Sequence, residues 1–236
     1  MIGGSPVASI RTGFAGQLAE LHSLVQEMGA FVSQMLDDSI QALLTQDASL
    51  AEDVRERDNV ADELDERIET LATRLLALQQ PMAGDLRAIT ASLKIVTDLE
   101  RIADYAVAIA RVAASLAGEP YFKPLEDTTR MADLVKEIVR QSLEAFDRND
   151  VAFAKQVRDS DKAIDQLWSK LEAELIDWMK REPRVVEQAT RLVLVARYFE
   201  RIGDHAKNIT ERVAFRETGH RKPWRFKEAA NGGGAA

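Results

Sequence analysis

The chain has 236 residues, of which 46% are hydrophobic and 30% charged, with a formal net charge of −8 at pH 7 and no cysteine. The length allows one large core or two smaller ones, and the missing cysteine excludes a disulfide framework and a thiolate metal site. The acidic balance argues against a protein that binds nucleic acid or an anionic membrane, because both need clustered Lys and Arg.

No stretch predicts direct insertion into a membrane. No window reaches about 18 uninterrupted apolar residues, the length that a spanning helix needs. The N-terminal residues also contain no apolar run of signal-peptide length. We therefore expect membrane association only through partners.

Helical spacing of apolar residues predicts three helices in the first half. The first spans residues 14–46 without an internal proline. The second opens near Ser49, which has capping-box spacing to Glu52, and ends before Pro81. The third runs from Pro81 to about Leu116, just before Gly118-Glu119-Pro120.

The second half, from Pro124 onward, repeats this plan. Residues of the first two helices recur at an offset of 103, and those of the third at an offset of 100 after the Glu182-Pro183 turn. Between 100–109 and 200–209, six of ten residues are identical, so that Glu100-Arg101-Ile102-Ala103-Asp104 returns as Glu200-Arg201-Ile202-Gly203-Asp204. The apolar positions of both copies fall on one helix seam, which predicts the core face. They are Leu99, Ile102, Ala106, Ile109 and Ala113 in the first copy, and Phe199, Ile202, Ala206, Ile209 and Val213 in the second.

These patterns predict an all-α fold of six long helices, arranged as two tandem, pseudo-symmetric three-helix bundles. The bundles should cover residues 14–118 and 122–216, with a flexible N-terminus at 1–13. Residues 217–236 form a basic, Gly-containing tail, which we expect to be disordered. Helix should account for about 75–80% of the chain, with no strand.

Acidic residues also repeat, four apart, on the second and third helices of each half. Like charges at this spacing weaken a helix by a few tenths of a kcal/mol, so their repetition favours a bound cation. Oxygen ligands suit Mg²⁺, Ca²⁺, Mn²⁺ or iron better than a closed zinc site. We expect one shared patch per half. The candidate ligands are Asp58, Asp62, Glu100 and Asp104 in the first half, and Asp161, Asp165, Glu200 and Asp204 in the second.

Ordinary surface ion pairing is the alternative explanation for these carboxylates. Arg101 lies three residues before Asp104, and Lys207 lies three residues after Asp204. Arg197 has the same spacing to Glu200. Such pairs are common and weak, and an acidic helix face is usually a solvated one. The duplication favours a functional interpretation.

Two residues beside the second acidic pair predict close packing. His205 is rotated by about 100° from Asp204 on a helix, which indicates an interfacial or packing histidine and not a ligand. Its counterpart in the first half is Tyr105. Gly203 in mid-helix costs about 1 kcal/mol against Ala, which predicts close approach of a neighbouring element.

Three stretches together resemble the PhoU family of phosphate-signalling regulators. They are Gln80-Pro81-x-Ala83-x-Asp85-Leu86-Arg87-x-Ile89, Leu93-Lys94-x-x-x-Asp98-Leu99-Glu100-Arg101-Ile102-Ala103-Asp104-Tyr105-Ala106 and Phe199-Glu200-Arg201-Ile202-Gly203-Asp204-His205-Ala206-Lys207-Asn208-Ile209. The resemblance, which covers residues 14–216, implies two three-helix bundles side by side and a cytoplasmic homodimer. It also implies metal ions (Mg, Mn, Fe or Zn) on the acidic faces.

The resemblance further implies a function. Such proteins link the ATPase subunit of a phosphate ABC transporter to a sensor histidine kinase, and they hold the phosphate-starvation response off when phosphate is plentiful. Arg87, Arg101 and Arg201 are the candidate partner-binding residues. The family usually has Gly before the Asp and Asn four residues after it. The second copy keeps both, so Asn208 joins the candidate metal ligands, whereas the first copy has Ala103 and Ala108. We therefore expect Glu200 and Asp204 to matter more than Glu100 and Asp104.

The sequence is also compatible with two other classes of function. A metal-binding carboxylate bundle could have a catalytic or storage role, and a plain helical scaffold would use the carboxylates for solubility alone. No Glu lies three residues before His22 or His205, as a ferritin-like di-iron bundle requires. No nucleophile-base pattern or phosphate-binding Gly loop occurs either, so the sequence argues against an enzyme.

Overall fold

The protein is all-α in residues 6–224, the part that the computed structural model describes. Helix accounts for 89% of these residues, and none of them lies in a strand. None of the helices in this part of the chain is both long and apolar enough to cross a membrane. The elements are α1 (Pro6–Thr45), α2 (Ala48–Glu56), α3 (Asp58–Gln79), α4 (Ala83–Leu116), α5 (Glu126–Arg148), α6 (Val151–Ser160), α7 (Lys162–Arg181), η1 (Pro183–Val185) and α8 (Val186–Thr218).

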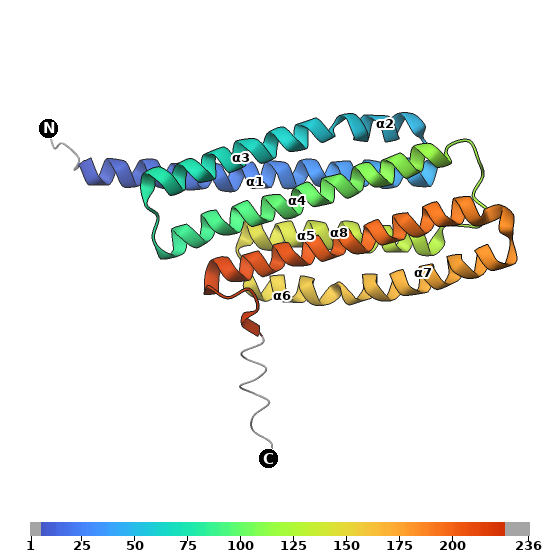
Figure 1. The fold of residues 1–236 in the computed structure, drawn as a ribbon. Helices are drawn as coiled ribbons and strands as arrows, with labels where there is room; N and C mark the ends of the chain where they lie inside the picture. Colours follow the sequence, from blue (N-terminus) through green and yellow to red (C-terminus); the bar gives the residue numbers. More distant parts are fainter. Residues whose placement is uncertain (1–5, 225–236) are drawn as a thin grey trace, which may run out of the picture.

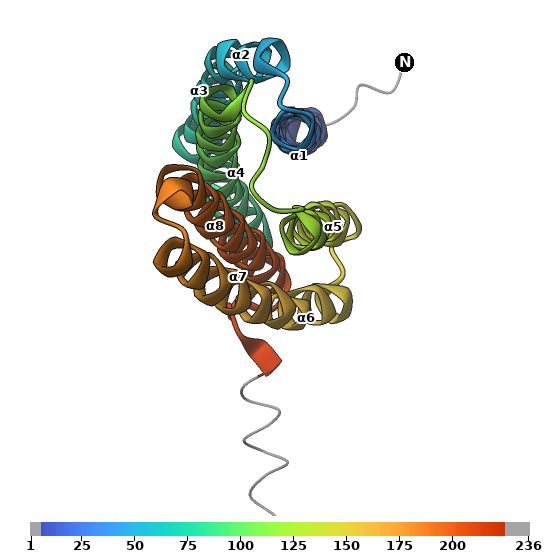
Figure 2. The same cartoon turned by 90° about the vertical axis from the view of Figure 1, so that its right-hand side faces the viewer.

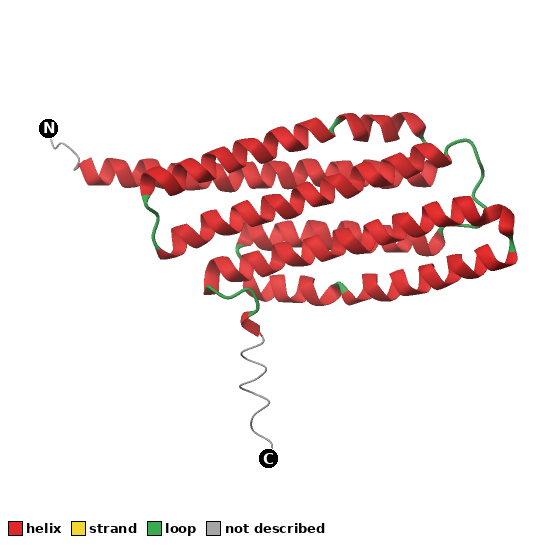
Figure 3. Cartoon of the chain, in the orientation of Figure 1, coloured by secondary structure: helices red, strands yellow, loops and turns green. Residues whose placement is uncertain are grey.

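The helices form two bundles that lie side by side, as predicted (Figures 1 and 3). The first bundle comprises α1 to α4 and the second α5 to α8. Viewed along the helices, α4 and α8 lie next to each other at the centre, with α3 and α7 on their outer sides (Figure 2). The bundles meet through α4 against α8 and through α1 against α5. The repeated third helices therefore pair with each other.

The predicted seams are the core faces of α4 and α8. Every one of their ten residues is buried, including Phe199 and Ile102 at 0% exposure. Burial of a large apolar side chain contributes roughly 1.5–3 kcal/mol, whereas helix propensity contributes only tenths per residue. The pattern of apolar residues thus fixes which face of each helix turns inward.

The predicted second helix of each half is interrupted once. α2 passes into α3 at Arg57, and α6 into α7 at Asp161, both with right-handed helical backbone angles. Hydrogen bonding continues across each junction, since the Val60 N–H donates to the Arg57 carbonyl and the Ile164 N–H to that of Asp161. No Pro or Gly marks these junctions, so periodicity predicts one continuous helix. The second interruption lies at the first predicted carboxylate of its half, Asp161, and the first lies one residue before that of its half, Asp58.

Helix ends differ in detail from the prediction. Asp47, not Ser49, caps α2, because its carboxylate accepts from the backbone N–H groups of Ser49 and Leu50. Asp150 caps α6 in the same way. α1 begins at Pro6, so the segment 6–13 that was predicted to be flexible is helical, whereas residues 1–5 lie outside the described part.

The first part of the predicted tail is also ordered. Residues 217–218 belong to α8, and the segment that follows folds back onto the second bundle. Trp224 is only 6% exposed, and the guanidinium of Arg158 lies 5.3 Å from the centre of its ring. The buried carboxylate of Glu211 pairs with Arg221 and Lys222, each at 2.9 Å. This buried acid anchors the segment, which corrects the prediction of disorder as far as Trp224; residues 225–236 lie outside the described part.

Candidate functional site

The carboxylates of the first half lie together between α3 and α4. Burial raises the pKa of Asp58, and Asp62 and Asp104 raise it further, against a lowering by Arg111. Burial likewise raises the pKa of Glu100, with contributions from Asp104, Asp62 and Asp65 that the lowering by Arg101 does not offset. Carboxylates of α3 and α4 therefore repel one another across a shared surface. We call Asp58, Asp62, Asp65, Glu100 and Asp104 the first patch.

Asp65 was not among the predicted ligands. It lies three residues after Asp62, on the same helix face, so helical spacing alone was a sufficient signal. The prediction used only carboxylates that occur in both halves, and the residue of the second half that corresponds to Asp65 is Trp168. Burial and the neighbouring Glu69 and Asp62 raise the pKa of Asp65. The first patch is thus one carboxylate richer than the second.

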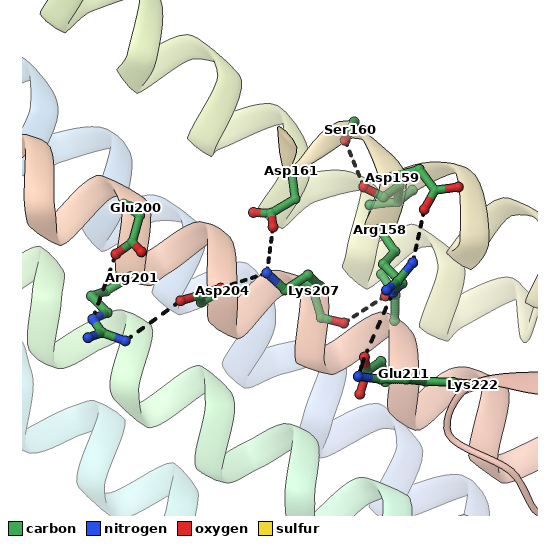
Figure 4. Close-up of polar contacts among 12 residues, drawn as sticks. Arg158, Asp159, Ser160, Asp161, Glu200, Arg201, Asp204, Lys207, Glu211 and Lys222 are labelled. Carbon is green, nitrogen blue, oxygen red and sulfur yellow. Dashed lines mark hydrogen bonds and ion pairs between the residues drawn. The ribbon is translucent and has the colours of Figure 1, made fainter. Parts of the chain in front are cut away.

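The second half surrounds its carboxylates with cations (Figure 4). The ammonium of Lys207 lies 2.5 Å from Asp161 Oδ2 and 2.6 Å from Asp204 Oδ1. Arg197 Nη1 lies 2.9 Å from Glu200 Oε2. We call Asp161, Asp165, Glu200 and Asp204 the second patch.

Burial and ion pairing act in opposite directions on the buried pair of Asp161 and Lys207. Burial lowers the pKa of Lys207, but the contacts with Asp161 and Asp204 outweigh it and raise this pKa above its usual value. Burial also raises the pKa of Asp161, against the lowering by Lys207. The two short contacts of the ammonium decide for a charged pair, because a neutral amine would gain little from them.

Two cations of the second patch, Arg197 and Lys207, have no counterparts in the first. Thr97 occupies the position of Arg197, and the buried Val107 occupies that of Lys207. Arg101 and Arg201 are common to both halves, and each pairs with the acidic residues beside it. The three ion pairs expected from sequence spacing are all present. Two of these pairs lie in the second patch and one in the first, so the negative charge of the second patch is better neutralised.

Gly203 permits the close approach that the sequence predicts. A Cβ atom at this position would lie 3.0 Å from Asp161 Oδ1 and 3.1 Å from Ile164 Cδ1. The first half has Ala103 at this position. The glycine lets the buried carboxylate of Asp161, at the junction of α6 and α7, approach α8.

His205 is interfacial, as predicted. Its Nδ1 lies 2.9 Å from Oδ1 of Asp98, which reaches across from α4, and its ring lies 5.9 Å from that of Tyr105. The side-chain amide of Asn208 donates to the same Asp98 oxygen at 3.1 Å. Asp98, only 8% exposed, is the central acceptor of this contact between the bundles. Asn208, a predicted metal ligand, therefore has a partner in the other bundle.

The remaining predicted residues have fold contacts of their own. Arg87 Nε donates to the Arg216 carbonyl and so ties the start of α4 to the end of α8. His220 has a Glu three residues before it, Glu217, but Gly219 ends α8 between them. The side chain of Glu217 accepts from Asn149, so this pair is not an inward-facing Glu-x-x-His element of a di-iron bundle.

The carboxylate oxygens of the first patch are of the type that a hard cation prefers, but the carboxylates lie too far apart to hold one in this structure. Within residues 6–224, no three His, Cys, Asp or Glu side chains stand close enough together to hold a metal ion. Arg101 pairs with only two of the five carboxylates of the first patch, Glu100 and Asp104, and a cation would relieve the repulsion that remains among the five. The second patch does not fit, because Lys207 lies between its acidic residues.

Removing one charge from the first patch should stabilise the protein when no divalent cation is present. For Glu100→Gln, loss of the repulsion by Asp104 predicts a gain of about 0.2–0.5 kcal/mol at neutral pH. The folded-state pKa of Glu100 lies above its ordinary value of 4.5. The stability that its protonation contributes is therefore complete below about 4.5 and lost as pH rises through the folded pKa. The advantage of the variant should shrink as pH falls, as thermal denaturation with chelator would show.

Glu137→Gln is the control with the opposite sign. A hydrogen bond from Arg140 lowers the pKa of Glu137. Its stabilising contribution is complete above the unfolded pKa, so this variant should lose stability at neutral pH. An equal response of both variants would contradict the assignment of repulsion to the first patch.

Duplicated three-helix bundles with acidic faces and a central pair of repeated helices define a class of tandem helical-repeat proteins. The sequence profile of the PhoU domain matches this chain twice, at residues 25–113 and 128–213. The chain belongs to the PhoU family. The two matches coincide with the two bundles.

Relatives and solved structures agree with this assignment. The chain is 36% identical over 207 residues to a phosphate-specific transport system accessory protein PhoU homologue of Clostridium acetobutylicum, covering 87% of this chain and 94% of the relative. A homologue of the same name from Aquifex aeolicus is 40% identical over 185 residues, or 78% and 84% of the two chains. The crystal structure of PhoU from Pseudomonas aeruginosa superposes with a TM-score of 0.85 at 34% identity, covering 87% of this chain and 99% of that one. PhoU from Streptococcus pneumoniae gives 0.83 at 28% identity, covering 88% and 98%.

Proposed function

We propose that this protein is a cytoplasmic negative regulator of the phosphate-starvation response and of phosphate uptake. The observation that carries the proposal is the presence of two complete PhoU domains in tandem. This chain aligns with 84–94% of the length of two relatives that are named as accessory proteins of the phosphate-specific transport system. An accessory role without catalysis agrees with the lack of a nucleophile-base pattern in the sequence.

The regulator would act by contact with partners. We propose a homodimer that links the ATPase subunit of a phosphate transporter to a sensor histidine kinase, and that reaches the membrane only through them. Arg101 and Arg201 are candidate contact residues, because their side chains are 53% and 44% exposed beside the two patches. Arg87 is a weaker candidate, since its guanidinium is already engaged by α8. The net charge of −8 favours protein partners over nucleic acid.

A metal ion is a second element of the proposal. Mg, Mn, Fe or Zn would bind at the first patch, where Asp58, Asp62 and Asp65 on α3 face Glu100 and Asp104 on α4. A bound cation would supply the positive charge that these carboxylates lack and would link the two helices. A catalytic or storage role has no support beyond this donor set. A plain scaffold would be indicated if protein prepared without chelators carried no metal.

Deletion of the gene should switch on the starvation response in phosphate-rich medium. The measurement is a phosphate-responsive reporter, such as secreted phosphatase activity, in the deletion strain and in strains complemented with wild type or variants. A reporter that stays silent after deletion would overturn the regulator proposal.

The acidic pairs should have unequal effects in the same assay. Glu100→Gln with Asp104→Asn should impair repression more than Glu200→Gln with Asp204→Asn, because among the described residues Arg101 alone pairs with Glu100 and Asp104, whereas Arg197, Arg201 and Lys207 share Glu200 and Asp204. This order reverses the expectation from the sequence, which rested on Asn208. Equal repression by both double variants would contradict the predicted difference between the two patches.

A further inference from the structure

The segment after α8 lies on the second bundle as a strap, by which we mean residues 220–224. Its anchor is the carboxylate of Glu211 on α8, which is only 3% exposed. Arg221 Nη2 lies 2.9 Å from Glu211 Oε2, and Lys222 Nζ lies 2.9 Å from Oε1. Arg158 of α6 approaches the same carboxylate from the bundle, with 3.8 Å between its Nε and Oε1 (Figure 4). The strap thus brings two cations to one buried acid.

A tryptophan completes this contact. Trp224 is 6% exposed, and the guanidinium of Arg158 lies 5.3 Å from the centre of its ring. We call Glu211 and Arg158, which come from two helices of the bundle, the Glu211 site. Its occupant consists of two adjacent cations followed two residues later by a tryptophan.

We propose that the Glu211 site is a docking site for a basic–aromatic segment of a partner protein, and that the strap occupies it in cis until such a segment displaces it. This inference rests on the proposed role in partner contact and names the chemistry of one partner. Charge complementarity selects that chemistry, because a buried carboxylate that loses its cations is strongly destabilising. A segment that replaces the strap must therefore bring cations of its own.

The strap can leave without disturbing the helix that precedes it. α8 ends at Thr218, and Gly219 follows with a φ of 75°, which suits glycine. The Gly219 N–H donates to the Phe215 carbonyl and so completes the helix cap before the strap begins. The contacts of the strap with the Glu211 site are made by side chains. Breaking them would open the site and leave the cap of α8 in place.

The first half of the chain has no such site. Arg111, which is exposed, occupies the position of Glu211. Arg55 occupies the position of Arg158 and pairs with Glu52 on its own helix. The buried acid is therefore not part of the packing plan that both bundles share.

The strap also leaves the site incompletely satisfied. Trp224 Nε1 and Arg158 Nε are both buried and have no hydrogen-bond partner among the residues that the structure describes. A buried donor without an acceptor carries a free-energy penalty. A segment in trans that offers acceptors to these two groups can therefore compete with the tethered strap.

The test uses full-length chains in which the strap is released. Arg221→Ser/Lys222→Ser/Trp224→Ala removes the three side chains that hold it, and Trp224→Ala alone is a second, milder release. The probe is a fluorescently labelled peptide with the sequence of residues 219–224, and fluorescence anisotropy measures its binding. Circular dichroism with thermal denaturation shows whether each variant is folded.

The peptide should bind the triple variant at least about tenfold more tightly than wild type, where the tethered strap competes at an effective concentration in the millimolar range. Adding Glu211→Gln to the triple variant should weaken binding by more than about tenfold, because a hydrogen bond to a charged group is worth at least that factor. A peptide with Trp224→Ala should bind at least about tenfold more weakly, since the indole supplies the large apolar contact.

Arg181→Ser/Arg184→Ser is the matched control for the loss of two cations. Both side chains are exposed, at 73% and 84%, and they lie at the end of α7 and in the turn that follows it. This variant should bind the peptide as weakly as wild type does.

Released variants that bind the peptide no more tightly than wild type would overturn the docking site, as would binding that survives Glu211→Gln. Unfolding of both released variants would show that the strap is an integral part of the bundle and would overturn the proposal too. Heterodimers of wild type and the triple variant that depend on Glu211, seen by size-exclusion chromatography, would make a second copy the occupant and contradict the assignment to a partner protein. These measurements use purified protein without phosphate, so their failure is distinct from failure of the regulator proposal, which the phosphate reporter tests in cells.

Discussion

Phe146→Ala should lower the free energy of unfolding by about 3–5 kcal/mol, the cost usual for a fully buried aromatic residue. Phe146 is 1% exposed on α5, and its ring lies 4.6 Å from that of His22 on α1. The guanidinium of Arg216 on α8 lies 5.7 Å from the same ring. The side chain therefore joins its own bundle to the first one, and its truncation would leave a cavity at this contact.

The loss would be visible as a lower thermal midpoint. For a chain of this size each kcal/mol corresponds to about 2–4 °C, so a decrease of about 6–20 °C is expected. Phe153→Ala on α6 is the matched control, because Phe153 is only partly buried. An equal decrease for both variants would show that Phe146 does not have the joining role assigned to it.

Gly203→Val should destabilise the protein by about 3 kcal/mol through overpacking. The first added carbon would lie 3.0 Å from Asp161 Oδ1 and 3.1 Å from Ile164 Cδ1, and both neighbours are buried. Asp161 cannot move away freely, because it is paired with Lys207. Urea unfolding in chelator measures this loss without a contribution from metal.

Gly84→Val is the control for the change in residue type. A Cβ at Gly84 in α4 would meet no atom within 4 Å. Its replacement should be neutral or slightly stabilising, because glycine is a poor helix former. A similar loss at both positions would mean that close contact at Gly203 is not the cause.

Sequence patterns were sufficient to predict the duplication, the core faces and most of the helical segments, but not the interruptions at Arg57 and Asp161. Apolar periodicity identifies which side of a helix turns inward, because burial of that side is the dominant stabilising term wherever the helix packs. The repeat of Glu100-Arg101-Ile102-Ala103-Asp104 was sufficient to find both halves. Spacing of three or four residues also predicted ion pairs within one helix, such as Arg197 with Glu200.

What each carboxylate faces depends on how the helices pack against one another. Lys207 and Asp161 are 46 residues apart in sequence, and Asp98 and His205 are 107 apart. Periodicity specifies a face but not the side chain that meets it from another helix, and a long flexible lysine can reach several partners. Likewise, the composition of a basic tail does not reveal the buried acid, Glu211, that holds its first part. The corresponding four carboxylates therefore pair with one arginine, Arg101, in the first bundle and with several cations in the second, because the additional partners come from other turns and other helices.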